Sequence, residues 1–162
     1  MIRLSALGLL LFGTIVAGCA RNVDPLTEIS AVKVVLDRFY IAQQKEDMAA
    51  LSALMAHDDD LVVFSLQEGK RYEGWEAVKE MYERQMMQSE GIQTSVADQV
   101  IAVSKDGTAS WVSSVNHAVG RSGVETVEMD YYSSLVLEKR DGKWLIVHLH
   151  NSQSRTKEAG AD

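Results

Sequence analysis

Hydrophobic residues recur at helical spacing in the first half of the chain. Between residues 27 and 45 they come at steps of three and four, which predicts an amphipathic helix with one buried face. Asp24 and Pro25 precede it, and a capping side chain followed by proline is a typical helix start. The same spacing predicts further helices from residue 48 to about 56 and from about 74 to 88.

The second half of the chain consists of apolar runs and alternating segments separated by glycine turns. A short strand is expected at 61–65, and residues 67–71 read as a turn. Asp106-Gly107, residues 120–123 and Asp141-Gly142 are predicted hairpin turns. The strands that they connect are expected within 92–104, 108–119, 124–139 and 143–151. Helices followed by an antiparallel meander indicate an α+β fold, and a strongly curved sheet under helices would enclose a pocket.

The last predicted strand carries two histidines, His148 and His150, two positions apart. Strict alternation places both imidazoles on one face, where they could donate or accept protons at the wall of a pocket. They could instead satisfy structural partners or lie at a dimer interface. A zinc site would need a third ligand, and the spacing of His117 does not provide one, so we expect no metal and no cofactor.

The N-terminal segment has the pattern of an export signal. A positive start at Arg3 precedes an apolar run over residues 4–16, which is shorter than the ~20 residues of a membrane-spanning helix. The run ends in Val16-Ala17-Gly18-Cys19, which resembles the bacterial lipobox. We therefore expect a signal peptide at 1–18, acylation of Cys19 and a tether at 19–26; an ordinary signal peptide or an uncleaved anchor are the alternatives. Ala20 in the next position favours the periplasmic side of an outer membrane.

Composition supports one globular domain and argues against nucleic acid as a partner. The chain has 162 residues, of which 46% are hydrophobic and 24% charged. Its formal charge is −7, and loss of residues 1–18 removes one arginine and no acid. An acidic chain without a basic patch does not attract nucleic acid or anionic lipid. The domain is expected at 27–152 and a polar tail at 153–162.

Three stretches of the chain resemble the SnoaL-like part of the NTF2-like superfamily. They are residues 38–51, residues 69–78 with their glycine-tryptophan opening of a helix, and residues 141–152 with Trp144 and both histidines. The resemblance implies an NTF2-like cone in which about three N-terminal helices pack on a strongly curved antiparallel sheet. The superfamily includes isomerases, cyclases, dehydratases and non-catalytic binding or assembly domains, so the fold does not determine an activity.

The resemblance also places the residues that ketosteroid isomerases of this superfamily use. Phe39 falls at the position of their helix tyrosine, with Tyr40 next to it, and Val63 falls at the position of their general base. Valine cannot abstract a proton, which argues against that chemistry. Tyr132 falls where related domains often carry an arginine, although one residue of slip would exchange it with Tyr131.

We therefore expect a membrane-anchored domain that binds a small organic molecule without catalysis and dimerises through its sheet. The alternatives are an isomerase, dehydratase or hydrolase with His148 or His150 as acid or base, partnered by Tyr40 or Tyr132, and a structural assembly domain with a filled core. The expected ligand-binding residues are Tyr40, Trp75, Tyr82, Tyr132, His148 and His150.

Overall fold

The computed structural model describes residues 23–88, 90–122 and 125–153. The expected signal peptide, Cys19 and residues 154–162 of the expected tail lie outside these ranges. The elements, in chain order, are α1 (Pro25–Gln44), α2 (Met48–Ser52), β1 (Val62–Ser65), β2 (Lys70–Glu73), α3 (Trp75–Gln88), β3 (Glu90–Val103), β4 (Ala109–Ser122), β5 (Glu125–Arg140) and β6 (Lys143–Gln153).

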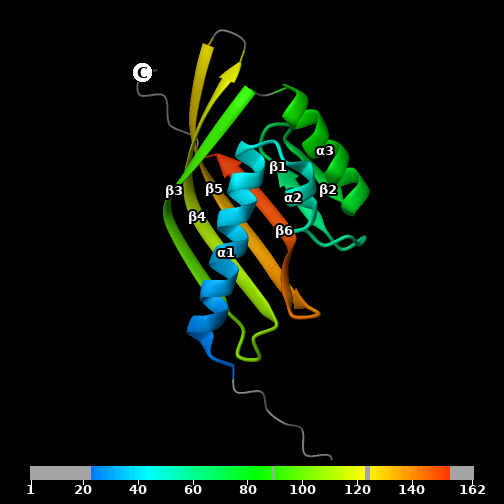
Figure 1. Cartoon of the computed structure of the whole chain (residues 1–162). Helices are drawn as coiled ribbons and strands as arrows, with labels where there is room; N and C mark the ends of the chain where they lie inside the picture. Colours follow the sequence, from blue (N-terminus) through cyan, green and yellow to red (C-terminus); the bar gives the residue numbers. More distant parts are fainter. Residues whose placement is uncertain (1–22, 89, 123–124, 154–162) are drawn as a thin grey trace, which may run out of the picture.

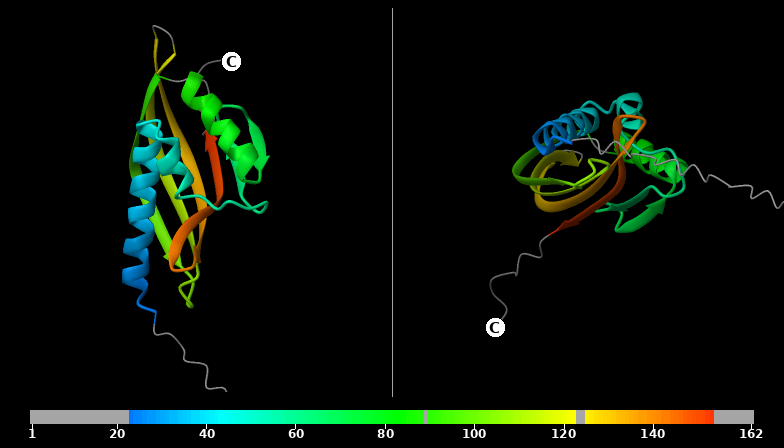
Figure 2. Two further views of the ribbon diagram at one scale, coloured as in Figure 1. Left: turned by 45° about the vertical axis from the view of Figure 1, so that its right-hand side comes forward. Right: turned by 90° about the horizontal axis from the view of Figure 1, so that it is seen from below.

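One curved sheet carries the helices on its concave side, as Figures 1 and 2 show. The strand order is β2-β1-β6-β5-β4-β3. All neighbouring strands are antiparallel except β1 and β6, which run parallel. The expected α+β cone is confirmed, and the predicted meander corresponds to β3–β6.

Helix α1 begins as the sequence predicts. The carboxylate of Asp24 accepts hydrogen bonds from Leu26 N (3.2 Å) and Thr27 Oγ1 (2.6 Å), and Pro25 occupies the first turn. The buried stripe includes Val32, Leu36 and Phe39, each at most 2% exposed. Burial of each such side chain contributes about 1.5–3 kcal/mol. This stripe joins α1 to the concave face of the sheet.

The hairpin turns at Asp106-Gly107 and Asp141-Gly142 form as predicted. Both Asp141 (φ +50°) and Gly142 (φ +79°) have positive φ, as a type I′ turn requires. The expected turn at 120–123 is wrong in part, because Gly120 lies within β4 and pairs with Val127. A side chain at Gly120 would approach Ile92 Cγ1 to 3.1 Å, so the glycine permits close packing of β3 on β4.

Two further predictions about local structure are wrong. Helix α2 ends at Ser52 and not near Ala56, because the following residues pair with the sheet: Ile146 N donates to Leu54 O and Ala56 N donates to Ile146 O, both at 2.9 Å. The expected turn at 67–71 contains the start of β2, which pairs with β1 at the sheet edge. Strand β2 has only four residues, so its sequence contains too few alternating positions to predict a strand.

Strand β6 contains a bulge at Val147. Ile146 pairs with Leu137, but His148 pairs with the next residue, Val136, so that Val147 has no partner on β5. The alternation of side chains therefore reverses within the strand. Trp144 and Ile146 face the core before the bulge, and Leu149 faces it afterwards.

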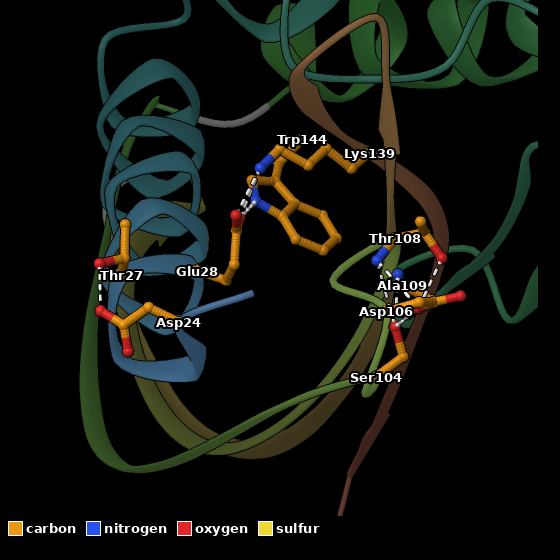
Figure 3. A network of polar contacts seen from close by, with 9 residues as sticks. All are labelled: Asp24, Thr27, Glu28, Ser104, Asp106, Thr108, Ala109, Lys139 and Trp144. Atoms are coloured by element: carbon orange, nitrogen blue, oxygen red, sulfur yellow. Dashed lines mark hydrogen bonds and ion pairs between the residues drawn. The ribbon is translucent and has the colours of Figure 1, made fainter. Parts of the chain in front are cut away.

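A partly buried ion pair connects the start of α1 to the β5–β6 hairpin (Figure 3). Lys139 Nζ lies 2.6 and 2.7 Å from the two carboxylate oxygens of Glu28, and Trp144 Nε1 donates to Glu28 Oε2 at 2.9 Å. The side chain of Glu28 is 15% exposed. The hydrogen bond from Lys139 lowers the pKa of Glu28 below its ordinary value of 4.5, although burial opposes this shift.

We expect Glu28→Gln to lower the free energy of unfolding by about 1–3 kcal/mol at pH 7, because it removes a charge-assisted bond from a protected site. The folded pKa of Glu28 is depressed, so its contribution is present above the unfolded pKa and is lost as pH falls through the folded pKa. Urea unfolding at pH 7 and at pH 3 measures both effects. The matched control, Glu80→Gln, changes a 71% exposed partner of Arg84 and should cost about 0.5 kcal/mol or less.

Candidate functional site

A cavity of about 440 Å³ lies between the helices and one end of the sheet. Its helical wall comes from the end of α1, with Gln43, and from α3, with Met81, Tyr82 and Met86. The end of β4 and the start of β5, yellow in Figure 1, extend past the end of α3. The volume lies in the range of pockets for small molecules.

The sheet provides a largely apolar floor. Val63 of β1, Leu149 of β6 and Ala118 of β4 line the cavity, together with Met129 of β5. Methionine side chains adapt to irregular shapes, because they are unbranched and polarizable. Such a floor favours the apolar body of an organic molecule.

Amides and hydroxyl groups provide most of the polar lining. Gln43 Nε2 lies 3.5 Å from Tyr82 Oη, and Gln85 Nε2 donates to Ser65 Oγ at 2.9 Å. Burial raises the pKa of Tyr82 far above its ordinary value, and burial also raises the pKa of Tyr131. Both phenols therefore stay protonated at neutral pH. Glu46 and Arg121 are the charged residues in the described lining.

Three polar side chains form a relay across the inner face of the sheet. Asn116 Nδ2 of β4 donates to Ser133 Oγ of β5 at 2.8 Å, and Ser133 Oγ donates to Asn151 Oδ1 of β6 at 2.6 Å. Asn116 is fully buried, Ser133 is 2% exposed, and Asn151 lines the cavity. The relay carries a polar connection from the core to the pocket.

Tyr40 lies in the core and does not line the cavity, which corrects its expected place there. Its side chain is 7% exposed, and its ring meets Phe39 edge to face at 5.5 Å. Tyr40 Oη, Ser114 Oγ and Asn116 Oδ1 are buried without a hydrogen-bond partner among the described residues. Burial raises the pKa of Tyr40, so the hydroxyl stays protonated.

The two histidines lie on the convex face, opposite the cavity. The bulge at Val147 puts His148 beside Val62 and His150 beside Phe64, with ring centroids of Phe64 and His150 5.0 Å apart. His148 is half-buried and His150 is exposed. Burial, and then the charge of His150, lowers the pKa of His148. Of the alternatives left open for this pair, the pocket wall is therefore not the one that its position on the sheet supports.

Two of the predicted aromatic residues also lie away from the cavity. Tyr132 points outward and is 49% exposed, whereas Tyr131 lines the cavity. Trp75 stacks on His57 at the start of α3, with ring centroids 4.2 Å apart. Tyr82 is the member of the predicted set that lines the cavity. A ligand-binding role for any of the six stays a prediction.

Sequence reasoning missed Asn151, Gln43 and Gln85, because amides carry no distinctive spacing. The orientation of Tyr131 did have a signal. The two-residue turn at Asp141-Gly142 pairs Trp144 with Lys139. Because Trp144 is buried, Lys139 and every second residue before it in β5, back to Tyr131, lie on the inner face of the sheet.

The described residues contain neither a metal-binding cluster nor a membrane-spanning helix. No three acidic, histidine or cysteine side chains in these ranges gather closely enough to hold a metal ion. His117, the third ligand considered for zinc, instead lies 2.8 Å from Asp130. Of the helices in the same ranges, none combines the length and apolar content needed to cross a bilayer.

Comparisons with known proteins agree with this architecture. A family model of the SnoaL-like domain matches residues 32–156. A candidate dehydratase of the NTF2-like family from Streptomyces avermitilis is similar in structure, with a TM-score of 0.75, 18% identity, and coverage of 82% of this chain and 100% of that one.

Two further solved structures share the fold. An NTF2-like superfamily protein from Salmonella enterica has a TM-score of 0.73, with 19% identity over 85% of this chain and 98% of that one. A type 2 hexachlorocyclohexane dehydrochlorinase has a TM-score of 0.70, with 17% identity over 84% of this chain and 92% of that one. No curated protein matches the chain. At these identities the likeness establishes the fold alone.

Proposed function

This chain belongs to the SnoaL-like domain family, and we propose that it is a module that binds a small, uncharged, largely apolar organic molecule. The cavity of about 440 Å³, with its apolar floor and its ring of amides and phenols, is the observation that carries the proposal. A neutral ligand suits it because protonated phenols and amides offer hydrogen bonds without requiring an opposite charge.

The catalytic alternative finds less support in the lining. A general base must lie within hydrogen-bond reach of the proton it removes, and both histidines are on the other face of the sheet. Val63, at the position of the isomerase base, lines the cavity as an apolar side chain. Similarity to a candidate dehydratase and a dehydrochlorinase keeps an enzyme among the alternatives.

We expect Ala118→Trp to weaken binding of Nile red, an uncharged dye, by about 10-fold or more, because the indole occupies the floor of the cavity. A fluorescence titration of the purified domain measures this. The control is His117→Trp, which adds an indole at the neighbouring position on the opposite face and should leave the affinity unchanged. Equal weakening by both variants, or no saturable binding by the wild type, would contradict the proposal.

We further propose that the convex face pairs with a second copy of the chain. Trp111, Val136, His148 and Val62 form one continuous row across β4, β5, β6 and β1. Trp111 is 55% exposed, Val136 36%, and the nearby Val100 61%. Soluble monomers rarely expose a large contiguous apolar patch, and such patches often mark protein–protein contacts.

The variant Trp111→Lys/Val136→Lys should convert a dimer to a monomer, because it places four buried charges in a paired face. Sedimentation velocity measures the change. Met87→Lys is the control, since Met87 is 78% exposed on α3 and should leave the mass unchanged. A wild type that sediments as a monomer at high micromolar concentration would overturn this proposal.

Anchoring to the periplasmic side of an outer membrane through acylated Cys19 also remains our proposal. Its support is the sequence alone: Val16-Ala17-Gly18 directly before the sole cysteine, after a short apolar run. Two or three acyl chains would hold the domain firmly, because each buried CH₂ contributes ~0.8 kcal/mol.

Mass spectrometry of the mature chain, extracted from membranes of a Gram-negative expression host, tests the anchor. The expected N-terminal peptide begins at Cys19 and carries the added mass of acyl chains. Cys19→Ala, which offers no thiol to acylate, should remain unprocessed. Recovery of the wild type as an intact, uncleaved chain with an unmodified Cys19 thiol would contradict the proposal.

A further inference from the structure

The relay across the sheet has a fixed direction. Its central hydroxyl, Ser133 Oγ, accepts a hydrogen bond from Asn116 Nδ2 and donates one to Asn151 Oδ1. A serine hydroxyl has a single proton, so the reverse direction would require the amides of Asn116 and Asn151 to turn together. Asn116 is fully buried, lies on β4 opposite Tyr131, and is held through Nδ2 by Ser133.

This direction determines which end of the Asn151 amide is left for a ligand. Oδ1 already accepts the bond from Ser133, and no described residue accepts a bond from Nδ2. Asn151 lines the cavity beside Leu149 and Tyr131. The free group that it offers is thus an N–H donor.

The hydroxyl groups of the two tyrosines in the pocket, Tyr82 and Tyr131, are also hydrogen-bond donors. Tyr82 Oη receives a weak bond from Gln43 Nε2, which leaves the phenolic proton available. Burial raises the pKa of both Tyr82 and Tyr131, so each remains an O–H donor over the neutral range. Donors therefore come from the helical wall and from the floor.

We propose that the ligand carries a hydrogen-bond acceptor, such as a ketone or ester oxygen, and that Asn151, oriented by Ser133 and Asn116, selects it. This inference rests on the proposed function and names the chemistry of its ligand. An apolar ligand that covers Asn151 would leave a buried donor unpaired, and the loss of such a bond corresponds to about 10-fold or more in affinity.

A pair of matched probes tests the inference. In 2-acetylnaphthalene the side group ends in a carbonyl oxygen, and in 2-isopropenylnaphthalene a CH₂ group replaces that oxygen at nearly the same size. Calorimetry should show at least about 10-fold tighter binding of the ketone to the wild type. The side-chain amide resonance of Asn151 should shift on addition of the ketone and much less with the hydrocarbon.

Variants of the relay residues test whether the relay causes the preference for the ketone. Asn151→Leu should remove the preference while the hydrocarbon still binds. Ser133→Ala should reduce the preference, because the amide of Asn151 is then free to turn. Ser134→Ala is the matched control, since this neighbouring serine lies on the outer face and pairs with His150. If Asn151→Leu does not fold, the two serine variants still decide the matter.

The outcomes separate this inference from the proposed function. Nile red binding without a preference for the ketone, including failure of both naphthalenes to bind, overturns the inference and leaves the binding function standing. Absence of binding by Nile red and both naphthalenes overturns both. An equal loss of preference in Ser133→Ala and Ser134→Ala also overturns the role of the relay.

Discussion

The extra residue in β6 is the constraint on which the arrangement of the site depends. Before Val147 the strand buries Trp144 and Ile146, and after it the buried residue is Leu149. Neighbouring segments of the same chain hold the bulge in place. Leu54 and Ala56 form backbone hydrogen bonds with Ile146, and β1 begins to pair with β6 only at His148. One inserted residue thus changes which side chains of the last strand meet the helices.

The chemistry of the cavity follows from that change. With unbroken alternation the pocket would contain two imidazoles, and with the bulge it contains the carboxamide of Asn151 and the side chain of Leu149. An imidazole titrates near neutral pH, whereas a carboxamide does not, so the interior holds its hydrogen-bonding pattern over a wide range of pH. The imidazoles instead lie on the face that we propose pairs with a second copy.

The fold was predictable where the signal was local. Asp24 and Pro25 correctly predicted the start of α1, and Asp141-Gly142 the last hairpin turn. Helical spacing of apolar residues correctly predicted α3. The bulge has no local signature, because Val147 is an ordinary strand residue and only its neighbours on β5 and the 54–56 segment show it to be extra.

The site was less predictable than the fold, since its residues are joined by long-range contacts. The relay connects residues 17 and 18 positions apart, and each of its side chains alone resembles a surface residue. Tyr40 shows the opposite error: its place next to the superfamily's helix tyrosine suggested a pocket residue, but packing beside Phe39 puts it in the core.

The position of the cavity along α1 has a consequence for access. The chain enters the domain at Asp24, and Gln43 and Glu46 border the cavity at the far end of the helix. Twenty helical residues span about 30 Å, so the cavity lies at the opposite end of α1 from the residue at which the chain enters the helix. A domain suspended from a lipid surface by its N-terminus would hold its opening out in the aqueous space. Ligands would then reach the cavity by diffusion through water and not by lateral transfer from the bilayer.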